Sequence, residues 1–146
     1  MTDLILRTAK SGDVNAIEIC ITSAYADAIR KIADMPDVAS GIEGDIANRN
    51  VLVAEEGAQL LGVIIYGLKA GVMMVFNLAV VPQAQGRGLA RKLLAAAEAD
   101  ALTAGLSVLC LRTHRLMGAT RAMYTHLGWQ EVEVTGNSVM MQKSVT

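Results

Sequence analysis

One segment of this chain constrains its fold more than any other: a strand-like run at residues 72–81 that leads through a glycine-containing turn into a helix. The run is rich in valine and other branched or aromatic residues, and Pro82 ends it. Gly86 and Gly88 follow, and apolar residues then recur at helical spacing until about residue 104. A strand, a tight turn and a helix in direct succession require a fold that combines sheet and helix.

The rest of the chain alternates strand and helix patterns without repeats, linkers or low-complexity tracts. Alternating or continuous apolar runs predict strands, and apolar residues three and four apart predict helices. The predicted strands are 4–9, 51–54, 60–68, 72–81, 107–112, 131–134 and 139–142, and the predicted helices are 13–30, a short segment from about 38 to 50, 88–104 and 119–127. In the order β-α-α-β-β-β-α-β-α-β-β, these elements predict a single α+β domain over residues 1–146.

Composition and patterning exclude several classes of protein. The chain has 13 Lys+Arg against 14 Asp+Glu, so it lacks the basic excess of a nucleic-acid binder. The longest mostly apolar stretches, 58–68 and 72–81, are shorter than the ~20 residues of a membrane-spanning helix. Residues 1–10 show no apolar run typical of a signal peptide. We therefore expect no nucleic-acid partner, no membrane segment and a cytoplasmic location.

The two cysteines, Cys20 and Cys110, both lie in apolar surroundings. Lone cysteines fit reduced, buried thiols better than a disulfide, and a metal site would need more ligands at short spacing. We expect two free thiols and no bound metal.

The turn at residues 82–88 has the features of an anion-binding site. Glycines between a strand and a helix allow backbone N–H groups to face one anion at the positive end of the helix. Arg87, Arg91 and Lys92 crowd the start of this helix, whereas the acidic residues lie towards its end. Helices favour the opposite arrangement, so a bound phosphate would explain these charges. The alternative is a glycine turn with solvated basic side chains.

Two common phosphate-binding motifs do not fit this turn. A P-loop has Lys and then Ser or Thr after its last glycine, but Gly88 is followed by Leu89 and Ala90. The dinucleotide fingerprint starts correctly with Gly86 and Gly88, but Arg91 occupies the position of its third small residue.

The turn resembles that of a known family. Residues 85–90, Gln-Gly-Arg-Gly-Leu-Ala, match the Gln/Arg-x-x-Gly-x-Gly/Ala pyrophosphate loop of the GCN5-related N-acetyltransferases (GNAT). Tyr124, with Gly128 and Trp129 after it, resembles the Leu-Tyr-x-x-x-Gly-Phe signature of the same family. The order of elements is also similar over essentially the whole chain. The resemblance implies a mixed, mostly antiparallel central sheet flanked by helices.

The resemblance also implies a site for acetyl-CoA in the opening between the fourth and fifth strands. Backbone groups of Leu78 and Val80 would hold the pantetheine arm and the thioester, and N–H groups of residues 86–91 would hold the pyrophosphate. One of the basic side chains beside the turn would reach the remaining phosphate. The residues implied in binding the coenzyme are Leu78, Ala79, Val80, Gln85, Gly86, Arg87, Gly88, Leu89, Ala90 and Arg91.

The chemistry follows from the thioester. A neutral amine would attack the carbonyl carbon directly, with both substrates bound, and the N–H of Val80 would stabilise the negative charge on the carbonyl oxygen. Tyr124 is the implied catalytic residue. It would donate a proton or a hydrogen bond to the departing thiolate, because a tyrosine with its ordinary pKa of ~10 is neutral near pH 7.

The group that removes the proton from the amine stays open. Many relatives carry a Glu near the end of the fifth strand, where this chain has Arg112, and an Asn often found further on is replaced by Met117. His114 is the nearest titratable alternative, because an unperturbed histidine titrates near neutrality. Proton release through ordered water is the other possibility.

The acceptor is expected to bind opposite the coenzyme, between the first two helices and the central strands. The candidate residues for this site are Tyr25, Asn77 and His114, with Asp27, Asp34 and Tyr66 as further candidates. The acceptor would be a primary amine of a small molecule or of a protein. A homodimer that pairs through the terminal hairpin, residues 130–142, is a further expectation.

The resemblance therefore implies an N-acetyltransferase that moves an acetyl group from acetyl-CoA to such an amine. Two alternatives stay open. One is a non-catalytic acyl-CoA-binding sensor or regulatory module of the same fold, suggested by Arg112 in place of the glutamate. The other is a nucleotide enzyme that uses the same anion-binding turn.

Overall fold

The computed structural model describes residues 3–145, which form one sheet with helices on both faces. The strands are β1 (Leu4–Thr8), β2 (Asn50–Glu56), β3 (Gln59–Lys69), β4 (Val72–Val80), β5 (Val108–His114), β6 (Gln130–Thr135) and β7 (Ser138–Ser144). The α-helices are α1 (Val14–Ala24), α2 (Ala26–Lys31), α3 (Ile42–Asn48), α4 (Leu89–Thr103) and α5 (Gly118–His126), and 3-10 turns cover Ser11–Asp13 and Pro82–Ala84.

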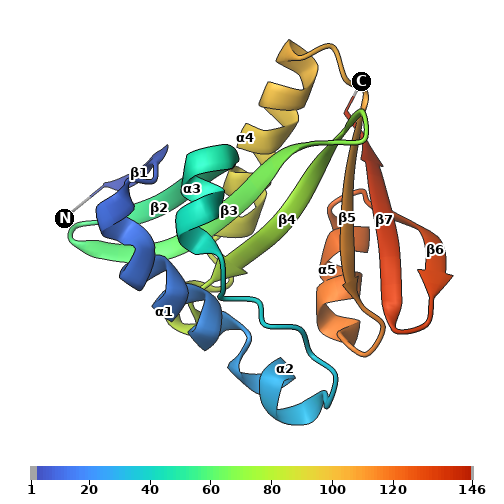
Figure 1. The fold of residues 1–146 in the computed structure, drawn as a ribbon, viewed down its shortest axis with the longest axis horizontal. Helices are drawn as coiled ribbons and strands as arrows, with labels where there is room; N and C mark the ends of the chain where they lie inside the picture. The colour runs from blue at the N-terminus through green and yellow to red at the C-terminus, as the bar shows by residue number, and fades with distance from the viewer. Residues whose placement is uncertain (1–2, 146) are drawn as a thin grey trace.

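The described strands make a seven-stranded sheet in the order β1-β2-β3-β4-β5-β7-β6 (Figure 1). Neighbouring strands are antiparallel except for β4 and β5, which run parallel. A parallel pair needs a crossover, and α4 supplies it between β4 and β5. The mixed, mostly antiparallel sheet expected from the sequence is therefore confirmed.

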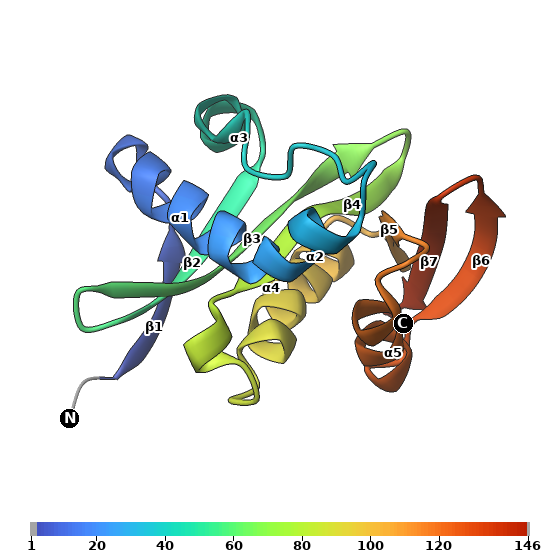
Figure 2. The same cartoon turned by 90° about the horizontal axis from the view of Figure 1, so that it is seen from below.

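The core lies on both sides of strand β3. Figure 2 shows α1, α2 and α3 on one face of the sheet, and α4 and α5 on the other. Residues 61–67 of β3 are all buried, because helices cover them from both sides. Ile17 and Ile21 of α1 and Leu93 of α4 are fully buried against the sheet. This two-sided cover explains the continuous apolar run in the sequence of β3.

Glycines end α4 and α5, as the sequence predicts. Gly105 and Gly128 have φ angles of +76° and +99°, which favour glycine. After α5, the N–H of Trp129 donates to the carbonyl of Tyr124 (3.0 Å) and the N–H of Gly128 to that of Thr125 (3.1 Å). These two hydrogen bonds form a Schellman motif, which fixes Trp129 against Tyr124.

The prediction of one continuous helix over residues 13–30 is wrong. The helix is interrupted at Tyr25 (φ −99°, ψ 8°) and divides into α1 and α2. The Tyr25 hydroxyl donates to the carbonyl of Leu78 on β4 (3.4 Å), so the interruption accompanies a contact with the sheet. Apolar periodicity does not reveal such a break, because helical hydrogen bonds continue on both sides of it. Three α-helices therefore precede β2, where the sequence predicted two.

The second predicted helix is shorter than expected, because α3 begins only at Ile42. Residues 32–41, which we call the strap, form turns and irregular backbone between α2 and α3. The side-chain amide of Asn77 on β4 donates to the carbonyl of Val38 in the strap (2.8 Å). The Val38 carbonyl is therefore bonded to a residue far away in sequence. The local apolar pattern, which cannot show this contact, predicted that Val38 belongs to the helix.

The parallel strands β4 and β5 separate part-way along the sheet. They pair over three positions only, the last being Val75 opposite Leu111. At Phe76, β4 has a bulge, so this residue has no partner on β3. Beyond that point the two strands diverge (Figure 1). The separation leaves one side of β4 without a neighbouring strand.

Candidate active site

The turn between β4 and α4 contains two glycines in the left-handed conformation. Gly86 has a φ angle of +84° and Gly88 of +79°. A Cβ atom added at either position would meet no atom within 4 Å, so the space beside the turn is open. Gly88 is also the N-cap of α4, and the turn therefore leads directly into the start of the helix.

The start of α4 has free backbone donors. Its first turn has no capping side chain and no acidic residue. The N–H of Lys92 donates to the carbonyl of Gly88 (3.1 Å), and the N–H groups of residues 89–91 have no acceptor within the helix. Arg91 adds positive charge beside them. The helix start therefore offers N–H donors and a positive potential to an anion.

Two side chains hold the turn against the sheet. The amide of Gln85 donates to the carbonyl of Val80 (3.1 Å). Arg87 pairs with Glu56 at the end of β2 (2.5 Å), and both side chains are partly exposed. Because a partly exposed ion pair contributes little to stability, Arg87 can exchange Glu56 for another anion at little cost.

β4 directs two of its peptide groups into the space left by β5. The N–H of Val81 donates to the carbonyl of Leu61 on β3 (2.9 Å). Because peptide directions alternate along a strand, the peptide groups of Leu78 and Val80 face away from β3. Both carbonyls accept hydrogen bonds from side chains, which agrees with this orientation.

Tyr124 of α5 lies at the separation of β4 and β5 and is 6% exposed. Trp129 packs against it edge-on, with ring centroids 5.5 Å apart. Burial raises the pKa of Tyr124 far above its ordinary value, and the nearby Tyr25 adds to the effect. No group in residues 3–145 hydrogen-bonds to the Tyr124 hydroxyl. The ring therefore borders a small cleft of about 30 Å³ with a neutral, unused donor.

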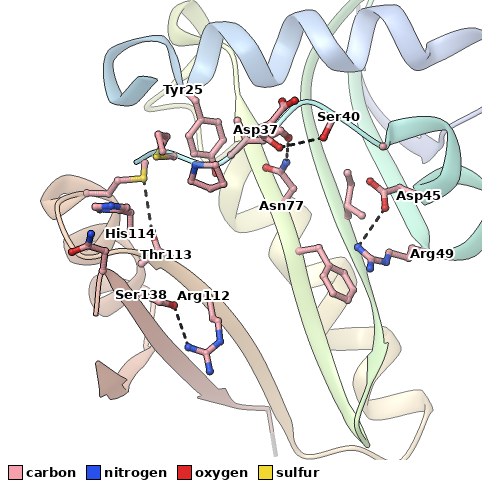
Figure 3. A pocket seen from close by; sticks show the side chains of 18 residues that line it. Tyr25, Asp37, Ser40, Asp45, Arg49, Asn77, Arg112, Thr113, His114 and Ser138 are labelled. Atoms are coloured by element: carbon pink, nitrogen blue, oxygen red, sulfur yellow. Dashed lines mark hydrogen bonds and ion pairs between the residues drawn. The ribbon is translucent and has the colours of Figure 1, made fainter. Parts of the chain in front are cut away.

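A larger cavity of about 480 Å³ lies under the strap (Figure 3). Strap residues 35–41 form its outer wall, α3 closes one side and the end of β5 the other. The cavity and the small cleft share five lining residues, namely Tyr25, Phe76, Asn77, Arg112 and Thr113. The two spaces therefore meet where β4 and β5 separate.

Hydrogen bonds fasten the strap over this cavity. Besides the bond from Asn77 to Val38, the carboxylate of Asp34 accepts from the amide of Asn137 (2.6 Å) and from Nε2 of His114 (2.7 Å). These contacts lower the pKa of Asp34, with Asn137 contributing most. The strap is therefore tied to β4, to the end of β5 and to the turn between β6 and β7.

Both ring nitrogens of His114 are occupied. The N–H of Leu116 donates to Nδ1 (3.1 Å), so Nδ1 carries no proton and the proton lies on Nε2, which faces Asp34. While both contacts hold, the ring has no free lone pair. His114 therefore cannot accept a proton from a substrate without losing one of these contacts.

Two charged residues, one in α3 and one at its C-terminal cap, line the cavity, and the sequence pattern did not indicate them. Asp45 and Arg49 pair along the helix (3.4 Å), and the Arg49 guanidinium lies over the Phe76 ring, 3.5 Å from its centre. Partial burial raises the pKa of Asp45, although Arg49 opposes the shift. Their separation of four residues is typical of an ion pair along a helix, and it was the one indication in the sequence. It does not show that the pair lies at the cavity, because that depends on how α3 packs beside the bulge.

Three residues predicted for the acceptor site, Tyr25, Asn77 and His114, all line this cavity. Tyr66 does not, because it lies on the opposite face of β3 and its hydroxyl donates to Asp100 of α4. Asp27 does not line it either; its carboxylate is exposed on α2 and pairs with a neighbouring arginine.

Other expectations concern the whole chain. Both cysteines are free and buried, as predicted, and burial raises the pKa of Cys20 to about 11. No helix within residues 3–145 is long and apolar enough to cross a bilayer. In the same range, no three His, Cys, Asp or Glu side chains gather as a metal site would require.

The profile of the acetyltransferase (GNAT) domain matches residues 47–131, which is more than half of the 146-residue chain. The matched segment includes the glycine turn, the separation of β4 and β5, and Tyr124. An uncharacterized N-acetyltransferase of Bacillus subtilis, YhfO, is 28% identical over 134 residues, covering 86% of this chain and 89% of that protein.

Solved structures share the fold. The PaiA N-acetyltransferase from Thermoplasma acidophilum, in complex with coenzyme A, has a TM-score of 0.84 at 17% identity, covering 97% of this chain and 99% of that one. The ribosomal-protein-S18-alanine N-acetyltransferase from Escherichia coli has a TM-score of 0.78 at 17% identity, covering 99% and 95%. Because only 17% of the residues are identical, these structures show a shared fold and nothing further about this chain.

Proposed function

The chain belongs to the GNAT family of acetyltransferases, and on this basis we propose that it moves an acetyl group from acetyl-CoA to a primary amine. The amine belongs to a small molecule or to a protein, and it attacks directly while both substrates are bound. Residues 1–146 act as one such domain. The observation that carries the proposal is that the separated strands β4 and β5 and a neutral tyrosine hydroxyl border one cleft, while β4 leads on to a helix start with free N–H groups.

Coenzyme A fits the open side of the glycine turn. The N–H groups of residues 86–91 bind its pyrophosphate, and the peptide groups of Leu78 and Val80 bind the pantetheine arm. Ala79 lies between these two residues, and its own peptide group is hydrogen-bonded to β3. Among the turn residues, Gln85 holds the turn in place. The buried Leu89 contributes through its backbone, whereas Arg87, Ala90 and Arg91 lie at the surface nearby.

The acetyl group then lies where the cleft meets the cavity. As the amine attacks, negative charge develops on the carbonyl oxygen, and the N–H of Val80 stabilises it, an effect of about 2.7–4 kcal/mol for one such donor. When the C–S bond breaks, the sulfur leaves as a thiolate. Tyr124 stabilises this thiolate through its hydroxyl, because burial keeps the hydroxyl protonated.

The attacking amine must lose a proton. Position 112 has an arginine instead of a carboxylate, and both nitrogens of His114 are already hydrogen-bonded. We therefore propose that water in the cavity of about 480 Å³ carries the proton to solvent.

Titration of the thiol released from acetyl-CoA, with a panel of primary amines, tests the proposal. Release should require both the amine and acetyl-CoA. Heat stabilisation provides a second measurement, since coenzyme A should raise the melting temperature and ATP or NAD should not. If no class of amine supports thiol release, the transferase proposal is wrong.

Two features of the setting are part of the proposal. Both cysteines are free, which fits a reducing compartment such as the cytoplasm. Pairing of two copies through the edge strand β6 would form a homodimer, which light scattering can measure.

A further inference from the structure

The eight arginines of the chain divide into two groups. Five of them pair with carboxylates, namely Arg7, Arg30, Arg49, Arg87 and Arg121. The described residues offer no carboxylate partner within ion-pair distance to Arg91, Arg112 and Arg115. Arg91 stands beside the proposed pyrophosphate site. Arg115 lines neither space, and it donates to the side-chain amide of Asn137. Arg112 differs from both, because it lines the acceptor side.

Arg112 lies on β5 where the large cavity meets the small cleft, and it lines both. Its guanidinium donates to the hydroxyl of Ser138 on β7 (3.1 Å; Figure 3). That contact is neutral and uses one of the five N–H donors of a guanidinium. An uncompensated positive charge therefore borders the place where the acetyl group and the amine meet.

The other charged groups around the cavity are engaged elsewhere. Asp45 of α3 pairs with Arg49 at the end of that helix, and the carboxylate of Asp34 accepts hydrogen bonds from His114 and Asn137. Asp37 of the strap accepts a hydrogen bond from a backbone N–H two residues on (3.3 Å) and forms no ion pair with Arg112 in the described structure. A guanidinium can form two parallel hydrogen bonds with a carboxylate, and no carboxylate of residues 3–145 takes that position.

We propose that the acceptor carries a carboxylate next to its amine, as an amino acid does, and that Arg112 binds this carboxylate. The inference rests on the proposed function, since it concerns the amine that receives the acetyl group. Because Arg112 borders the junction of the two spaces, the carboxylate lies close to the reacting nitrogen. This favours an α-amino acid over a long polyamine, which has no anionic group. A cavity of about 480 Å³ is of the size usual for small-molecule sites.

Acceptors that differ only in the carboxylate test this inference. Amino acids are compared with their carboxamides and with the corresponding decarboxylated amines, at saturating acetyl-CoA, by thiol release. We expect kcat/KM to be at least about tenfold higher for the amino acids, because hydrogen bonds between charged groups contribute more than neutral ones.

Variants of Arg112 assign the preference to this side chain. Arg112→Gln should raise KM for amino acids about tenfold or more and leave the values for carboxamides within about twofold. Arg112→Lys keeps the charge without the paired N–H groups, so it should retain part of the preference. Arg115→Gln is the matched control, because it removes a guanidinium that also lacks a carboxylate partner but lines neither space. Melting temperatures establish that each variant is folded.

Two kinetic outcomes would overturn the inference and leave the proposed function intact. One is equal kcat/KM for amino acids and their carboxamides. The other is a fall in kcat for all acceptors alike in Arg112→Gln, which would place the guanidinium at the thioester.

Calorimetric titration of the coenzyme A complex with the same compounds separates the two proposals. Binding of amino acids that is lost in Arg112→Gln supports the inference, even if no amine is acetylated and the transferase proposal falls. Equal affinity of wild type and Arg112→Gln for amino acids, or no binding by either, overturns it.

Discussion

The hydroxyl of Tyr124 can donate a hydrogen bond but resists ionisation. Burial raises its pKa far above the ordinary value of 10, and Trp129 holds the ring in place. A donor whose pKa exceeds that of a thiol (~8.5) gives a thiolate a hydrogen bond more readily than a whole proton. At the proposed site, Tyr124 therefore stabilises the departing sulfur by hydrogen bonding.

Tyr124→Phe keeps the ring and its contact with Trp129 but removes the donor. We expect kcat to fall about tenfold to a hundredfold, since a hydrogen bond to a charged group contributes about 1.5–3 kcal/mol. The KM for acetyl-CoA should stay within about twofold. Steady-state kinetics with a saturating amine measure both.

Tyr66→Phe is the matched control for this variant. It removes a tyrosine hydroxyl that donates to Asp100 on the other face of the sheet. The melting temperature should fall while kcat stays unchanged. A normal kcat in Tyr124→Phe, or an equal loss in Tyr66→Phe, would refute the role of Tyr124.

The face on which a residue lies decided which of the candidate acceptor residues line the cavity. Ile65 and Asn77 are paired on neighbouring strands, and both line the cavity. Tyr66 is the next residue along β3, and its side chain points to α4 instead. Adjacent strand residues point to opposite faces, so a shift of one residue moves a side chain from the site to the core. The bulge at Phe76 changes this register, and the sequence does not show the bulge.

Helix α4 is flanked at both ends by glycines in the same backbone conformation. Gly88 and Gly105 have φ angles of +79° and +76°, and an added Cβ meets nothing within 4 Å at either. Their surroundings differ. Gly88 precedes N–H groups that lack acceptors within the helix, whereas the turn at Gly105 is closed by a hydrogen bond from Leu106 to Ala101 (2.9 Å).

Gly88→Glu and Gly105→Glu therefore form a matched pair. Each places a side chain in the left-handed region at a cost of about 1–2 kcal/mol, so both should lower the melting temperature by a few degrees. Only Gly88→Glu should lose heat stabilisation by coenzyme A, because its carboxylate would occupy the position of the pyrophosphate. Retained stabilisation in Gly88→Glu, or its loss in Gly105→Glu, would show that the phosphates bind elsewhere.

The ends of elements were predictable where a local residue sets them. Gly105 and Gly128 end their helices through hydrogen bonds between neighbours in sequence. By contrast, two differences from the predicted helices accompany contacts with β4. The interruption at Tyr25 accompanies its hydrogen bond to Leu78. The late start of α3 accompanies the hydrogen bond from Asn77 to the strap. These partners lie far away in sequence, so a local pattern contains no trace of them.

A network of charges joins three elements at the N-terminal edge of the molecule. Arg7 of β1 forms two hydrogen bonds with Asp13 at the start of α1 (2.8 and 2.9 Å) and one with Glu55 of β2 (2.8 Å). The contact with Arg7 is the main reason why the pKa of Asp13 falls from its ordinary value of 3.8 to about 2. The contribution of Asp13 to this network therefore requires its ionised form.

Asp13→Asn should lower the melting temperature at pH 7 by roughly 2–4 °C, which corresponds to about 1 kcal/mol. Because the folded pKa of Asp13 lies below its ordinary value, its contribution is complete above about pH 4 and disappears as the pH falls towards about 2. The difference from wild type should therefore narrow below pH 4. Melting curves from pH 7 to pH 3 measure it.

Asp27→Asn is the control, since it removes an exposed ion pair on α2. It should change the melting temperature little at any pH, because such pairs contribute little. A pH-independent deficit in Asp13→Asn would mean that lost packing, and not lost charge, destabilises it.

The cavity of about 480 Å³ belongs to the molecule as a whole. Its lining comes from the joint between α1 and α2, the strap, α3, the strands β4 and β5, and the turn before β7. Asn137 and Asp34, which help to close it, are 103 residues apart. Such a cavity exists only when all of these segments are in place, so its electrostatics cannot be obtained from any one of them.

The amino-acid sequence by itself determined the alternation of strands and helices, the glycine turn before α4 and the helix stops. These features depend on backbone conformations and hydrogen bonds within a few residues, and residue type encodes them directly. The tertiary structure alone decided the bulge at Phe76, the strap, the occupied nitrogens of His114 and the position of Arg112 at the junction. Each of these arises from packing between distant segments, whose register and separation no local pattern records.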